Sequence, residues 1–222
     1  MGIIFTHERI NTVLALVGLA IASVSAWYQF GPDPDELKID VEGKVVVGNI
    51  EKVSEWHFRE SPGVLIGPVA WKFVVYNPLD RPVSVISLDV FYIPKEGLVK
   101  YSDLLNGVTE SSTNSIMNFP VTLAGREAIA FNLNLNIPAE ADEESEENCI
   151  NSGTHISEIE KCLYVKGRDL FGNGVTVQSR TTDHLNVSWS GSFDSPTFLL
   201  ILKTADDSEI SKIFRYYPEL GG

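Results

Sequence analysis

Most of the chain after Pro34 alternates between hydrophobic and polar residues with a period of two, which is typical of half-buried β-strands. The clearest example runs from Ile129 to Ile137, where apolar residues at the odd positions alternate with Asn132, Asn134 and Asn136. This pattern predicts a strand with one face in the core and the other in solvent.

Similar segments recur along the chain and are separated by clusters of turn-forming residues. They cover residues 37–47, 70–77, 86–92, 185–190 and 197–202. In two of them the residues expected on the core face are Trp71, Phe73 and Val75, and Ile86, Leu88, Val90 and Tyr92. We also expect a hairpin in which strands 161–168 and 175–181 flank the loop 169–174, where Gly and Asn residues supply positive φ angles.

The last part of the chain allows two interpretations. Residues 197–202 are apolar on both faces, which suits a strand that is covered on both sides. Asp206 and Glu209 match a capping box, which would begin a short helix. The apolar residues that would lie on one face of that helix are Ile210, Ile213, Phe214 and Tyr217. A closing strand that pairs with residues 197–202 is the alternative.

Short strands without intervening helices indicate an antiparallel sandwich or barrel. Three expected elements give the chain a recognisable pattern. They are the link Asn77–Pro82 between two strands, the hairpin between Pro120 and Ile137, and the last hairpin with its Asp-Leu-Phe-Gly loop. Over residues 37–182 this pattern resembles immunoglobulin-like domains. The resemblance implies a mainly β, antiparallel immunoglobulin-like β-sandwich, although the Cys…Trp…Cys core of antibody domains is absent.

The N-terminal part has a different pattern, because no charge interrupts residues 12–30. These nineteen residues would form a helix about 28 Å long, close to the thickness of a bilayer's hydrocarbon core. The sequence therefore predicts one transmembrane helix. Its small residues recur every three or four positions and form a stripe where another membrane helix can pack closely: Ala15, Gly18, Ala22 and Ala26.

Two other interpretations of the N-terminus remain. A cleaved signal peptide would also contain an apolar run, and Val24-Ser25-Ala26 is an acceptable cleavage site. Arg9 is the only cationic side chain before the run, however, and the run exceeds the usual length of a signal peptide. The first six residues also match the short N-myristoylation pattern, but a lipid anchor would be redundant beside a membrane helix.

These observations predict five parts of the chain. They are a tail (1–11), the transmembrane helix (12–30), a linker (31–36), the β-sandwich (37–182), and C-terminal strands or a short helix packed on it (183–222). Arg9 before the helix favours an N-terminus in the cytoplasm under the positive-inside rule. We expect a single-pass protein of the cell membrane with its C-terminal domain outside the cytoplasm.

Composition narrows the classes of function. The chain has 222 residues, of which 44% are hydrophobic and 21% charged, so it is typical of a folded protein. Its net charge of −13 argues against a nucleic-acid partner, because phosphate binding requires cations. Lipid and membrane proteins are the partners that the apolar segment predicts.

The negative charge is concentrated in residues 139–148. This segment does not have the alternating acids and central glycine of an EF-hand, so we interpret it as a solvated loop that a basic surface of a partner protein would bind. The carboxylates concerned are Glu140, Asp142, Glu143, Glu144, Glu146 and Glu147.

The two cysteines, Cys149 and Cys162, flank His155. A disulfide needs only these two residues, and it persists outside the cytoplasm. Free thiols are the expectation for a cytoplasmic domain, and a zinc site would need further ligands from elsewhere. We expect the disulfide, and it is the main support for placing the domain outside the cytoplasm.

The sequence predicts no catalytic, cofactor or metal site. It contains no G-x-S-x-G elbow, phosphate-binding loop or H-E-x-x-H helix. We therefore expect a structural or accessory subunit of a membrane complex that acts through protein–protein contacts. A ligand-binding or sensory ectodomain is the alternative, with Trp56, His57 and Phe58 in a long loop as its candidate surface, and a membrane-bound hydrolase ranks third.

Overall fold

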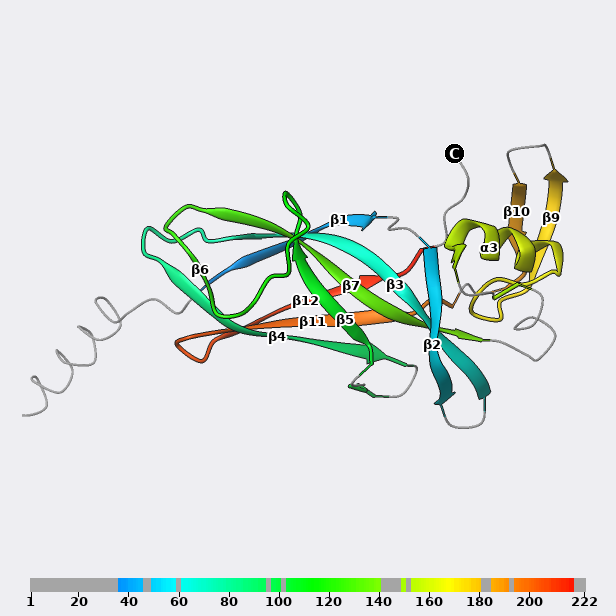
Figure 1. Cartoon of the computed structure of the whole chain (residues 1–222), viewed down its shortest axis with the longest axis horizontal. Helices are drawn as coiled ribbons and strands as arrows, with labels where there is room; N and C mark the ends of the chain where they lie inside the picture. The colour runs from blue at the N-terminus through cyan, green and yellow to red at the C-terminus, as the bar shows by residue number, and fades with distance from the viewer. Residues whose placement is uncertain are drawn as a thin grey trace, which may run out of the picture. The chain divides into compact units, whose positions relative to one another are not determined.

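The structure is a computed structural model, and all of the described residues belong to the compact unit Asp35–Gly222 (Figure 1). The described residues are 36–45, 49–58, 61–94, 97–100, 103–140, 149–150, 153–180, 185–191 and 194–217. The predicted helix 12–30 and its stripe, Ala15, Gly18, Ala22 and Ala26, lie outside these residues. Within the described ranges no helix has both the length and the apolar character to cross a membrane.

The described unit is mainly β and its paired strands are antiparallel, as the alternation predicts. The largest sheet contains β1 (Lys38–Val45), β2 (Asn49–Phe58), β3 (Ser61–Tyr76), β5 (Leu105–Glu110), β7 (Ala128–Glu140) and β8 (Thr154–His155). The long strand β3 lies at its centre, with β7 along one edge and β1 and β2 sharing the other. We call this the first sheet.

The second sheet has the order β12-β11-β4-β6. Its strands are β4 (Val83–Ile93), β6 (Val121–Leu123), β11 (Thr197–Thr204) and β12 (Glu209–Arg215). The C-terminal residues therefore form a closing strand that pairs with β11, and the alternative of a short helix is wrong. A separate two-stranded sheet consists of β9 (Val175–Arg180) and β10 (Leu185–Trp189).

Aromatic rings from both sheets meet in one core. Trp71 of β3 packs edge-on against Phe198 of β11, with ring centroids 5.7 Å apart, and against Phe214 of β12 at 5.4 Å. On the first sheet, Phe73 stacks on Phe131 of β7 at 5.6 Å. The predicted core faces of residues 70–77 and 129–137 are thus confirmed, with Trp71, Phe73, Val75 and Phe131 all buried.

Two details of the alternation are wrong. Ile86 was expected on the core face, but a register shift in β4 leaves it without an opposing residue, and it is 43% exposed. A β-bulge of this kind reverses the face of the residues beyond it. Asn136, which was expected in solvent, is buried and donates a hydrogen bond of 2.6 Å to the carbonyl of Asp103.

The expected hairpin of strands 161–168 and 175–181 is also wrong, because residues 161–165 belong to helix α3 (Ile156–Val165) and β9 pairs with β10. Ile156, Ile159 and Leu163 recur at helical spacing and are buried together. The side chain of His155 caps the first turn by accepting a 3.4 Å hydrogen bond from the amide of Ser157. The helical spacing of apolar residues begins at Ile156, so the segment that was expected to be a strand contains only the second half of α3.

The link Asn77–Pro82 is a turn, as predicted, and carries the chain from β3 in the first sheet to β4 in the second. The buried Asn77 holds it together. Its amide nitrogen donates to the carbonyls of Arg81, at 2.8 Å, and Ala124, at 2.9 Å, while its oxygen accepts from the amide of Leu79 at 3.0 Å. An asparagine in such a turn therefore fixes the crossing between the two sheets.

Candidate functional site

Strand β11 is apolar on both faces, but the described residues cover only one of them. Phe198, Leu200 and Leu202 are buried in the core. Leu199 and Ile201 alternate with them and point to the opposite side of the second sheet, where they are half-buried. The sequence predicts that β11 is covered on both sides, and its outer side is the candidate functional site.

The register of the second sheet extends this outer side across three strands. Leu199 pairs directly with Ile213 of β12 on one side and with Phe91 of β4 on the other. Residues paired in this way in an antiparallel sheet have their side chains on the same face. Phe91, Leu199 and Ile213 therefore form one apolar row, and Figure 1 shows the three strands side by side.

A second row lies beside the first. Tyr92 and Val99 form an antiparallel bridge with hydrogen bonds of 2.9 Å in both directions, which places Leu98 next to Ile93 on the outer side. Ile213 is 60% exposed and Leu98 57% exposed. We define the outer apolar face as the six residues Phe91, Ile93, Leu98, Leu199, Ile201 and Ile213.

Among the residues that the structure describes, three cations and three anions lie around the outer apolar face. The ammonium group of Lys100 lies 5.6 Å from the ring centroid of Phe91 and also pairs with Asp89. Lys203 and Asp207 form an ion pair of 2.6 Å, and the hydrogen bond to Asp207 raises the pKa of Lys203. The six charged side chains are Lys100, Lys203, Arg215, Asp89, Asp207 and Glu209.

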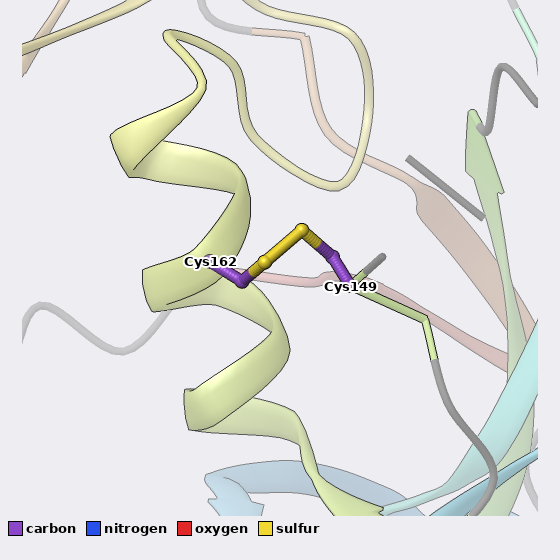
Figure 2. Close-up of a disulfide and its surroundings, with 2 residues drawn as sticks. All are labelled: Cys149 and Cys162. Carbon is purple, nitrogen blue, oxygen red and sulfur yellow. A yellow bond between two sulfur atoms is a disulfide. The ribbon is translucent and has the colours of Figure 1, made fainter. Parts of the chain in front are cut away.

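The predicted disulfide is present. Cys149 is bonded to Cys162 of α3 and the two Cα atoms are 5.6 Å apart, as Figure 2 shows. It attaches the helix to the segment that follows the acidic stretch. Of the acidic residues, only Glu140 is described, at the end of β7, where its amide donates a 2.9 Å hydrogen bond to the carbonyl of Leu170. The others, Asp142, Glu143, Glu144, Glu146 and Glu147, lie outside the described residues.

Buried polar groups connect α3 to the rest of the unit. Glu160 is only 1% exposed, and its Oε1 accepts a 2.6 Å hydrogen bond from the phenol of Tyr216. Tyr216 in turn packs edge-on against Phe171, with ring centroids 5.2 Å apart, and against Trp71. This contact is structural, because it joins α3 and its following loop to the core between the sheets.

A second buried carboxylate, Asp169, organises the loop after α3. Its Oδ1 accepts from the amides of Phe171 and Asn173 at 2.8 and 2.9 Å. Its Oδ2 accepts from the side chains of Asn173, at 2.7 Å, and Trp189, at 3.1 Å. Four donors satisfy the charge of this buried carboxylate. Asp169 therefore holds the loop and strand β10 together.

Tyr164 interacts electrostatically with both of these carboxylates. Burial raises its pKa, and the negative charges of Glu160 and Asp169 raise it further. The hydroxyl has no hydrogen-bond partner among the described residues. The phenol therefore stays neutral, and its ring packs edge-on against Trp189 at 6.4 Å.

The long loop that was expected to carry a ligand-binding surface is a β-strand. Trp56, His57 and Phe58 belong to strand β2, where they pair with Gly63, Pro62 and Ser61, and not to a long loop. In the described part of the chain, no group of three His, Cys, Asp or Glu residues could hold a metal ion.

Comparisons of this chain with known proteins identify no related protein. No family model matches the chain, no curated protein matches it, and no solved structure matches it. The function of the chain is therefore inferred from its own residues. The outer apolar face was missed as a site, although its signal was visible in the sequence as the two-sided apolar run of residues 197–202.

Proposed function

We propose that this chain is a single-pass, membrane-anchored accessory subunit that acts through protein–protein contacts. In this proposal, residues 12–30 form the membrane helix and contact integral membrane proteins. The β-rich unit is an immunoglobulin-like sandwich outside the cytoplasm, and its outer apolar face binds a protein.

One observation carries the proposal: Phe91, Leu199 and Ile213 are in register across three strands on the side of the second sheet that faces away from the core. Scattered single hydrophobic residues are common on protein surfaces, whereas a contiguous apolar patch with a polar rim is typical of a protein interface. The patch also lies on paired strands, so its geometry is preformed and binding needs little reordering.

Further observations support the remaining parts. Ring contacts between Trp71 of the first sheet and Phe198 and Phe214 of the second support a sandwich, in which two sheets share one core. The disulfide supports a domain outside the cytoplasm, because such bonds persist in oxidising compartments. The absence of charge in residues 12–30 supports the anchor.

The test compares two matched substitutions in the full chain, which is isolated from its native membrane in mild detergent. Ile213→Asp places a charge in the outer apolar face. Ile116→Asp is the control, because Ile116 is 77% exposed and lies beside β5 in the bridge to Thr109. We expect the wild type and the control to retain the same stoichiometric protein partner, and Ile213→Asp to lose it.

The same partner on all three chains would contradict the proposed role of the outer apolar face. Saturable binding of a small molecule, with no protein partner on any chain, would favour a ligand-binding or sensory ectodomain. Thermal melting of each variant checks that the unit is folded, and both substituted positions are exposed, so we expect similar melting temperatures.

A further inference from the structure

We infer that the partner on the outer apolar face is a second copy of this chain, related to the first by a two-fold axis. This inference rests on the proposed function, since it names the occupant of the same face. Two properties of the face carry it: the balance of its charges and the order of residues along β12.

The charge balance argues against a strongly charged partner. The whole chain has a net charge of −13, yet the six charged side chains named above, all in the described part of the chain, comprise three cations and three anions. A basic partner would be complementary to an acidic surface, because interfaces match potentials of opposite sign. A neutral, apolar face is instead complementary to another neutral, apolar face, and a second copy supplies one.

The order of residues along β12 makes the face self-complementary. Its outward positions are Arg215, Ile213, Ser211 and Glu209, so a cation ends the row on one side and an anion on the other. A two-fold axis that crosses the strands at the level of Lys212 reverses this order in the second copy. Arg215 of each copy then lies opposite Glu209 of the other, as an isologous interface requires.

The same axis also matches the apolar residues of β11. It places Leu199 of one copy opposite Ile201 of the other, because these two positions lie on either side of Leu200, which pairs with Lys212. On β11 the centre of the contact is apolar, and the two ends of β12 are charged, while the same axis places Ile213 opposite Ser211 and Phe91 opposite Asp89. Apolar residues near the centre of a contact and charges at its ends are typical of protein interfaces.

The contact that we infer is face to face, not edge to edge. Lys212 of β12 lies 3.7 Å from Asp40 of β1, so the edge of the second sheet is turned towards β1. β12 also carries charged residues along its length, which discourage the addition of another strand. An anchor at residues 12–30 would keep all copies in one membrane and raise their effective concentration.

The first experiment uses cysteine cross-linking of the full chain in its native membrane. Both native cysteines are in the disulfide, so an introduced cysteine is the only free thiol. Ser211→Cys lies near the inferred axis, and Ser112→Cys, which is exposed in the turn after β5, is the control. We expect a bifunctional thiol reagent to give a covalent dimer with Ser211→Cys and only monomer with Ser112→Cys.

The second experiment exchanges charges across the inferred axis, again in the Ser211→Cys background. Arg215→Glu creates two Glu–Glu contacts, and we expect the dimer yield to fall roughly tenfold or more, because like charges at an interface cost several kcal/mol. Arg215→Glu combined with Glu209→Arg restores opposite charges, so the dimer should return. A different protein as partner could not give this rescue.

Failure of this inference is distinguishable from failure of the proposed function. Equal monomer yields for Ser211→Cys and Ser112→Cys would overturn the second copy as partner. If Ile213→Asp still released a different protein, the proposed function would stand without the dimer. Protection of the Ser211→Cys thiol by phosphatidylcholine vesicles in a monomeric chain would overturn the inference in favour of lipid as the occupant.

Discussion

The phenol of Tyr216 donates a 2.6 Å hydrogen bond to Oε1 of Glu160, and this bond joins the residue after the last strand to helix α3. Both side chains are buried. A hydrogen bond to a carboxylate contributes more than one between neutral groups, and a buried acceptor that loses its donor is costly. The attachment of the residues after β12 to helix α3 therefore depends on a polar contact inside an otherwise aromatic cluster.

Tyr216→Phe removes that donor without changing the shape of the ring. We expect the free energy of unfolding to fall by about 2 kcal/mol, as for the loss of a hydrogen bond to a buried charged group. Urea denaturation followed by tryptophan fluorescence measures the change. Tyr217→Phe is the control, since Tyr217 is exposed, and a similar loss from both substitutions would contradict the assigned role of Tyr216.

Tyr164→Phe should behave differently, because the hydroxyl of Tyr164 has no hydrogen-bond partner among the described residues. Removal of a buried, unsatisfied hydroxyl is expected to leave stability near pH 7 unchanged or slightly higher. A destabilisation of more than about 1 kcal/mol would mean that the hydroxyl has a partner that the described residues do not contain.

The same residue predicts a pH dependence above neutrality. The pKa of Tyr164 is raised in the folded state, so above pH 10, where an ordinary tyrosine ionises, the unfolded chain binds fewer protons than the folded chain. Unfolding then becomes easier as the pH rises, by up to about 1.4 kcal/mol per pH unit. Tyr164→Phe should lack this contribution, and parallel stability curves for the two proteins between pH 9 and pH 11 would contradict it.

The alternation in β7 predicts opposite effects at two adjacent positions. Phe131→Asp places a charge beside Phe73 in the core and should cost at least about 3 kcal/mol, or prevent folding. Asn132→Asp should cost less than about 1 kcal/mol, because an aspartate at this position can still accept the 2.9 Å hydrogen bond from Ser111. Equal losses in the melting temperature would contradict the core face of β7.

Replacement of both Cys149 and Cys162 by serine tests the disulfide and the proposed topology together. The bond spans a sequence separation of 13 residues, and loops of this size are stabilised by about 3 kcal/mol when closed. We expect a lower melting temperature and unchanged recovery in the membrane fraction. Alkylation of unreduced protein, denatured directly from its native membrane, should modify no thiol, and two modified thiols would place the domain in the cytoplasm.

Strand positions could be predicted from the sequence wherever a period of two was uninterrupted. Trp71, Phe73 and Phe131 are buried as the pattern predicts, because a strand with one face in the core has no other way to arrange alternating residues. The predicted core position of Ile86 is wrong because a bulge depends on the pairing of β4 with β11. This pairing cannot be deduced from the sequence of either segment alone.

Helix α3 could not be identified from a window that began at residue 161, since its apolar spacing starts at Ile156. Only the β11 part of the outer apolar face could be predicted from the sequence. The two-sided apolar character of residues 197–202 was recognised, but the contributions of Phe91 and Ile213 depend on strand order. Strand order is a property of long-range pairing, which local propensity does not specify.

The order of strands in the second sheet has a consequence for the synthesis of this protein. Strand β4 pairs with β11, which the ribosome makes after all of the strands from β5 to β10, and β6 pairs only with Val83–Val85 on the other edge of β4. Until residues 197–204 emerge, the edge of β4 that pairs with β11 has no partner strand. Pairings between distant segments form slowly, and unpaired strand edges aggregate. Nascent chains that lack β11 are therefore the form of this protein that most needs a chaperone.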